Sequence, residues 1–138
     1  MPDVTAMAID EMEGIHGGMV RRARASLGVT GWGMQVLTLP PGWDGYPSHE
    51  HGPEAYDPNQ EEVYIPLEGG GTLVAEGAEY ALRPGVMVRV GPTQLRRIVP
   101  GTDGIHLLAL GGKPGAFSAG AWTELGADPP SPPGTQEA

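Results

Sequence analysis

Short apolar runs separated by glycine- and proline-rich turns constrain the fold of this chain more than any other feature of its sequence. Glycine and proline account for 23 and 15 of the 138 residues, and most of them stand between these runs. No run has the apolar spacing of a helix of ordinary length. About eight short strands joined by such turns are typical of an antiparallel all-β sandwich or barrel. Besides the extended segment around His49 and His51, the predicted strands are residues 32–39, 62–67, 72–75, 79–82, 86–90, 94–99 and 105–110. A hairpin turn is predicted at residues 68–71 and a loop at residues 100–104.

The length of the chain predicts one domain, within which four segments differ in character. Residues 1–28 are predicted to form an N-terminal arm that covers the barrel or a dimer interface, and residues 29–112 form the barrel. Residues 113–128 form an extension that packs on the barrel. Residues 129–138 are a proline-rich tail that lacks the apolar surface needed to fold, and we expect it to be disordered. The large apolar residues of the extension are Phe117, Trp122 and Leu125.

The charge and composition of the chain exclude several classes of function. The formal net charge is −9 with a single lysine, so a partner with a phosphate backbone would be repelled and nucleic-acid binding is not expected. There is no cysteine, which excludes disulfides, thiolate metal sites and a cysteine nucleophile. No apolar run approaches the length of a membrane span, and the first residues lack a signal-peptide pattern. We therefore expect a cytoplasmic protein without a membrane partner.

Two histidines one residue apart are the strongest indication of chemistry. On an extended strand, residues i and i+2 point to the same face, so His49 and His51 can direct two imidazoles at one point. Glu62 stands at the head of the next predicted strand and can add a carboxylate. Two histidines and one carboxylate form the facial set of ligands of non-haem iron sites, which other divalent metals also accept. The pattern predicts a site for a divalent metal such as Fe, Mn, Zn or Ni.

The same residues resemble the first sequence motif of the cupin superfamily. In that motif a glycine precedes a His-x-His pair, and a glutamate stands six residues before a second glycine. Here Gly42 precedes His49 by one residue more than the motif has, and six residues separate Glu62 from Gly69, which selects Glu62 over the glutamate before it. Ten residues separate His51 from Glu62, more than usual, which predicts an enlarged polar loop over residues 52–60.

The resemblance covers residues 32–111 and is to the small single-domain cupins of the conserved-barrel (cupin-2-like) type. It implies a double-stranded β-helix, or jelly-roll barrel, with little helix, and it implies a homodimer. The second cupin motif is poorly matched, because only Gly85 agrees with it. Arg96 stands where that motif has a histidine that would be the fourth metal ligand.

Arg96 leaves the chemistry of the site open. Strand alternation places Gln94, Arg96 and Ile98 on one face, which the resemblance directs into the barrel. A guanidinium has no free lone pair for a metal, so Arg96 either pairs with Glu62 and takes the carboxylate from the metal, or holds a carboxylate or phosphate of a ligand beside the metal. A one-residue slip would instead turn Arg96 to solvent. Tyr64 lies on the face of Glu62 and offers a hydroxyl as donor or weak acid, so Tyr64 and Arg96 are the candidate catalytic residues.

Two functions of different classes agree with these observations. The first is a cupin that binds a divalent metal through His49, His51 and Glu62 and a small anionic organic ligand near Arg96, as a metal-dependent dioxygenase, isomerase or lyase. The alternative is a metal-free, non-enzymatic cupin that binds a small molecule such as a sugar or an acid.

Overall fold

The structure is a computed structural model that describes residues 1–117 of the chain. Its N-terminal part holds the 3₁₀ turns Ile9–Glu11 and His16–Gly18, the short strands β1 (Gly14–Ile15) and β2 (Val20–Arg21), and the helix α1 (Ala23–Leu27). The remaining strands are β3 (Gly33–Leu39), β4 (Glu61–Ala75), β5 (Ala78–Leu82), β6 (Val88–Val90) and β7 (Arg97–Gly112). Trp122, Leu125 and the predicted tail, residues 129–138, lie outside the described residues.

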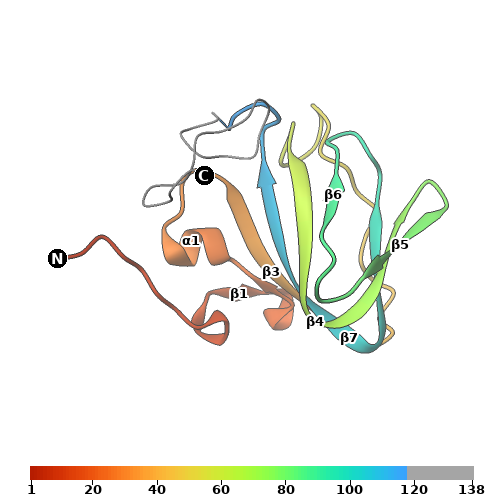
Figure 1. The fold of residues 1–138 in the computed structure, drawn as a ribbon, viewed down its shortest axis with the longest axis horizontal. Helices are drawn as coiled ribbons and strands as arrows, with labels where there is room; N and C mark the ends of the chain where they lie inside the picture. The colour runs from red at the N-terminus through yellow and green to blue at the C-terminus, as the bar shows by residue number, and fades with distance from the viewer. Residues whose placement is uncertain (118–138) are drawn as a thin grey trace, which may run out of the picture.

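The strands form an antiparallel sheet in the order β1-β2-β3-β7-β4-β5, with β6 paired to β4. Figure 1 shows β3, β7 and β4 side by side, with β5 and β6 beyond β4. The two long strands belong to both halves of the fold. Residues 61–66 of β4 pair with residues 107–112 of β7 and with β6, whereas residues 71–75 pair with the start of β7 and with β5. The predicted all-β antiparallel class is confirmed.

The predicted hairpin turn at residues 68–71 and the predicted loop at residues 100–104 are wrong, because both are bends within long strands. The register between β4 and β7 shifts between Pro66 and Glu68 and again between Gly69 and Gly71. Gly69 has a φ of +74°, and a Cβ there would collide with the carbonyl of Gly104. Turns and bulges both need glycine, so local composition alone does not separate them. The four short strands predicted here are therefore two strands that continue through the bends.

The faces of β3 separate the interior of the barrel from its outer cover. Leu37 and Leu39 belong to the inner core with Tyr64, and Gln35 has the same inward phase near the start of the strand. Val36 is buried on the opposite face, where Met12 and Ala23 of the N-terminal segment pack against it. The remaining inner-core residues are Leu73, Leu82, Val90, Ile98, Ile105, Leu107 and Ala109.

The outer face of β4 is only partly covered in this single chain. Val63 and Ile65 are half-buried, and Leu67 is 45% exposed. A second copy of the chain could bury this face, and the homodimer implied by the cupin resemblance stays a prediction. Among residues 1–117, no helix is long and apolar enough to cross a membrane.

Replacing Gly69 by alanine tests the bend. Because the new Cβ would meet backbone and the φ is positive, we expect Gly69→Ala to lower the free energy of unfolding by about 3 kcal/mol. Gly77 is the matched control, since its φ is +78° but a Cβ there meets nothing within 4 Å. We expect Gly77→Ala to cost only about 1 kcal/mol in the same urea titration. Equal losses at the two positions would contradict the steric role of Gly69.

Candidate metal centre

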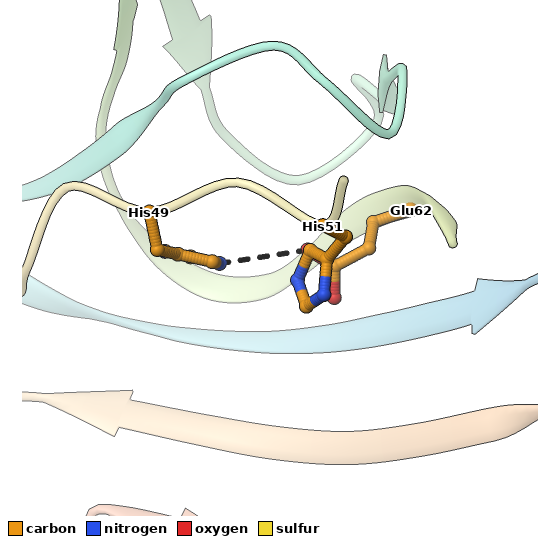
Figure 2. Close-up of side chains that lie close together, drawn as sticks. All are labelled: His49, His51 and Glu62. Atoms are coloured by element: carbon orange, nitrogen blue, oxygen red, sulfur yellow. Dashed lines mark ion pairs between the residues drawn. The ribbon is translucent and has the colours of Figure 1, made fainter. Parts of the chain in front are cut away.

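The structure brings together the three side chains predicted to bind a metal. One ligand atom from each of His49, His51 and Glu62 lies within 4.8 Å of the other two. Figure 2 shows both imidazoles directed toward the carboxylate. Oε1 of Glu62 lies 3.1 Å from Nε2 of His51 and 3.7 Å from Nε2 of His49. This is the cluster that the spacing of the sequence predicts.

Backbone pairing with the segment before β7 positions the two histidines. The amide of His49 donates to the carbonyl of Arg96 and the amide of Arg96 donates to the carbonyl of His49, each at 3.0 Å. The amide of His51 donates to the carbonyl of Pro92 at 2.6 Å. The backbone is thus extended from His49 to His51, which puts both side chains on one face. Glu62, at the start of β4, approaches the same point from the neighbouring strand.

Backbone carbonyls orient both imidazoles. Nδ1 of His51 lies 2.8 Å from the carbonyl oxygen of Asp57, and Nδ1 of His49 lies 3.3 Å from that of Pro47. A carbonyl oxygen only accepts hydrogen bonds, so Nδ1 of each ring carries a proton. When the ring is neutral, as a metal ligand must be, Nε2 therefore presents a lone pair. Sequence reasoning missed Asp57, because its contribution is a main-chain oxygen of the enlarged loop and carries no signal in residue type.

The lone pair of His51 faces a negative charge. Its Nε2 is buried and has no hydrogen-bond partner within residues 1–117, yet it lies 3.1 Å from the Glu62 carboxylate. A buried polar atom without a partner destabilises a fold unless something satisfies it. A cation between the imidazoles and the carboxylate would satisfy all three groups at once. The residues present therefore fit a divalent metal.

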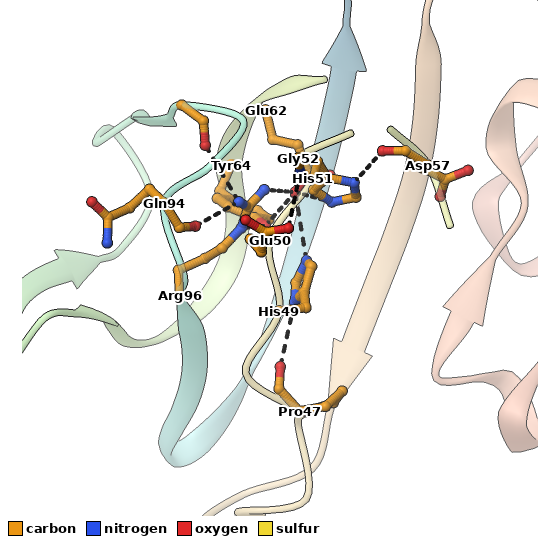
Figure 3. A network of polar contacts seen from close by, with 11 residues as sticks. Pro47, His49, Glu50, His51, Gly52, Asp57, Glu62, Tyr64, Gln94 and Arg96 are labelled. Atoms are coloured by element: carbon orange, nitrogen blue, oxygen red, sulfur yellow. Dashed lines mark hydrogen bonds and ion pairs between the residues drawn. The ribbon is translucent and has the colours of Figure 1, made fainter. Parts of the chain in front are cut away.

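Arg96 and Tyr64 both donate hydrogen bonds to the Glu62 carboxylate, which the histidines also approach (Figure 3). The guanidinium donates from Nη2 to Oε1 of Glu62, from Nε to the Tyr64 hydroxyl at 3.2 Å, and from Nη1 to the carbonyl of Gln94 at 2.9 Å. The Tyr64 hydroxyl donates to the same Oε1 of Glu62 at 2.6 Å. The predicted inward phase of Arg96 and Ile98 is confirmed, since both are 1% exposed.

These contacts set the ionisation of the site. Burial raises the pKa of Glu62, but its interactions with His49, Tyr64 and Arg96 outweigh that effect and lower the pKa to about 2. Burial raises the pKa of Tyr64 far above its usual value, and the nearby Tyr46 and Glu62 add to the shift. Glu62 is therefore a carboxylate and Tyr64 a neutral phenol at neutral pH. Tyr64 can donate a hydrogen bond here but cannot act as a base.

A cavity opens in front of the three candidate ligands. Arg96 lies behind Glu62 and Tyr64, with a side chain that is 0% exposed. The sequence allows an inward-facing Arg96 either to pair with Glu62 or to hold an anionic group of a ligand. The structure shows the ion pair with Glu62. His49 is the most open of the three, with 29% of its side chain exposed, and Tyr46 packs against its ring at 5.6 Å between centroids. The other residues of the inner wall are Leu37, Leu39, Trp43, His51, Glu62, Tyr64 and Ala109.

Comparisons with known proteins give structural neighbours only, because no protein-family model and no curated protein matches this chain. A cupin protein from Bacteroides fragilis is similar with a TM-score of 0.69 and 23% identity, over 93% of this chain and 99% of that one. A putative sugar phosphate isomerase from Acidithiobacillus ferrooxidans has a TM-score of 0.54 and 26% identity, over 67% of this chain and 56% of its own. For DMSP lyase DddQ from Ruegeria pomeroyi, the TM-score is 0.52 and the identity 22%, over 68% of this chain and 45% of its own. This chain thus spans only about half the length of each of these last two neighbours.

Removing the Arg96 side chain tests its hold on Glu62. Arg96→Met leaves a largely buried carboxylate without its counter-ion, so we expect the free energy of unfolding to fall by about 3 kcal/mol in urea with a chelator present. The matched control is Arg89→Met, which breaks the exposed pair with Glu61 and should cost less than about 1 kcal/mol. If the two variants unfold at the same urea concentration, Arg96 does not stabilise the buried carboxylate.

Proposed function

We propose that His49, His51 and Glu62 bind one divalent metal and that the cavity binds a small organic ligand. The cupin fold, which the sequence predicts, supports this proposal. The observation that carries the metal proposal is the buried Nε2 of His51, which has no hydrogen-bond partner within residues 1–117 and lies 3.1 Å from the Glu62 carboxylate. The two imidazoles and the carboxylate are a donor set that suits Fe, Mn, Zn or Ni. Three protein ligands leave positions open toward the cavity for a ligand oxygen.

The metal, when bound, would polarise an oxygen of the ligand or bind dioxygen, and the protein groups around it would set its environment. Tyr64 and Arg96 are positioning residues in this proposal, because both donate to Glu62 and fix the carboxylate that the metal needs. The apolar wall made by Leu37, Leu39 and Trp43 would exclude water from the ligand.

A reaction on a small organic molecule is the enzymatic form of the proposal, as a dioxygenase or as an isomerase or lyase. The names of two structural neighbours, a putative sugar phosphate isomerase and a DMSP lyase, support small-molecule chemistry in this fold. The fold alone does not choose a reaction.

A metal-free binding protein is the second candidate, and the Arg96–Glu62 ion pair favours it. The guanidinium already neutralises the carboxylate that a metal would use. In that case His49, His51 and Tyr46 would hydrogen-bond a sugar or an acid within the cavity.

Metal content separates the two candidates. We expect the wild type, loaded with Zn or Mn and dialysed, to retain about one ion per chain by elemental analysis, and we expect His51→Ala to retain none because one of only three ligands is gone. His16→Asn is the control, since His16 lies outside the centre and asparagine tolerates its positive φ of 53°. A folded wild type that retains no metal would establish the metal-free alternative.

The role of Tyr64 is measurable as a change in metal affinity. Tyr64→Phe removes one hydrogen bond to Glu62 and keeps the ring in the core, so we expect metal affinity to fall about 10- to 100-fold by calorimetry. Tyr80→Phe is the control at an exposed tyrosine, and its affinity should equal that of the wild type. Unchanged affinity in Tyr64→Phe would mean that the hydroxyl does not orient the ligand.

A further inference from the structure

The charges buried at the candidate metal centre cancel without a metal. Glu62 contributes one negative charge, and Arg96 contributes one positive charge through a direct ion pair. His49 and His51 are neutral when they act as metal ligands. Tyr64 stays protonated against the carboxylate to which it donates. A His-His-Glu centre without the arginine would carry one negative charge, whereas this one carries none.

A divalent metal would therefore leave two positive charges at a centre where only His49 is substantially open to the cavity. The side chains of His51 and Glu62 are 10% and 15% exposed, and that of Arg96 is 0% exposed. Uncompensated charge at such depth is strongly unfavourable and must be matched by charges nearby. Among residues 1–117, the cluster contains no further carboxylate, so an anionic ligand in the open positions would supply the negative charge.

We infer that Arg96 sets the ligand class of this centre: a small organic anion that binds the metal directly through one or two carboxylate oxygens. Arg96 favours this ligand through its charge and not by contact, since its side chain lies behind Glu62 and Tyr64. The inference rests on the metal of the proposed function. In the sequence analysis, one possible role of Arg96 is to bind the anion directly. The inference replaces that role with an electrostatic effect at a distance.

The charges at the rim of the cavity do not set this preference. They are of both signs and, apart from Glu50, exposed, so water and salt screen them more than a buried charge. The half-buried Glu50 carboxylate accepts a hydrogen bond from the amide of Gly52 at 3.1 Å. The exposed charged residues that line the cavity are Arg22, Arg24, Glu54, Asp57 and Lys113.

Tyr64 provides a matched control for Arg96. Both side chains donate to the same oxygen of Glu62, but only Arg96 carries a charge. Arg96→Gln removes the charge together with its hydrogen bonds, whereas Tyr64→Phe removes the hydrogen bonds of its hydroxyl with Glu62 and Arg96 but no charge. If Arg96→Gln loses more anion affinity than Tyr64→Phe, the charge of Arg96 is responsible. If both variants lose the same affinity, the orientation of Glu62 is responsible.

The experiment is a titration of cobalt-loaded protein with malonate, a dianion, and with imidazole, a neutral ligand, followed by the visible absorption of the metal. We expect malonate affinity to fall by about tenfold or more in Arg96→Gln and by a clearly smaller factor in Tyr64→Phe, which weakens the metal site but removes no charge. Imidazole affinity should be the same in the wild type and in Arg96→Gln. Arg96→Lys keeps the charge, should keep the malonate affinity, and carries the test if Arg96→Gln does not fold.

The inference would be overturned by equal malonate losses in Arg96→Gln and Tyr64→Phe, by a parallel loss of imidazole affinity in Arg96→Gln, or by a tenfold malonate loss in Arg96→Lys. A wild type that binds no cobalt would contradict the proposed function itself. A cobalt-loaded set of proteins with identical malonate affinities would contradict the charge inference and leave the metal site standing.

Discussion

The ion pair between Arg96 and Glu62 is the interaction on which the rest of the site depends. It joins the strand segment that pairs with the histidines to the start of β4, across the interior of the barrel. A buried pair of this kind is stable only when its other polar atoms are satisfied, and here Tyr64 and the carbonyl of Gln94 complete the set. Glu62 is thus held ionised where both imidazoles can meet it.

The long strands make this meeting possible. Because β4 and β7 pass through both halves of the fold, Glu62 and Tyr64 have a fixed position relative to Arg96 just before β7. The glycines at the bends let the two strands approach each other where side chains would collide. The geometry of the centre therefore depends on backbone contacts far from any of its ligands.

Much of the fold and of the candidate site could be predicted from residue type and from the alternation of side chains along a strand. The two-residue spacing of His49 and His51 and the inward phase of Arg96 and Ile98 follow from the strand period, and the structure has both. The choice between two roles for Arg96 could not be made from sequence, since it depends on Tyr64 reaching the guanidinium across the barrel. Sequence alone predicts a turn at Gly69 where the structure has a bend within β4, because glycine is favoured in turns and in bulges alike.

The carbonyl of Asp57 has a consequence for how this chain can change over evolution. Every residue type has the same main-chain oxygen, so the contact with Nδ1 of His51 constrains the path of the loop over residues 52–60 but not the side chain at position 57. Substitutions can accumulate in this loop while the imidazole keeps its orientation. Insertions or deletions that displace the carbonyl would be selected against as strictly as changes to a ligand. We therefore expect the length of this loop to be conserved more strongly than its sequence.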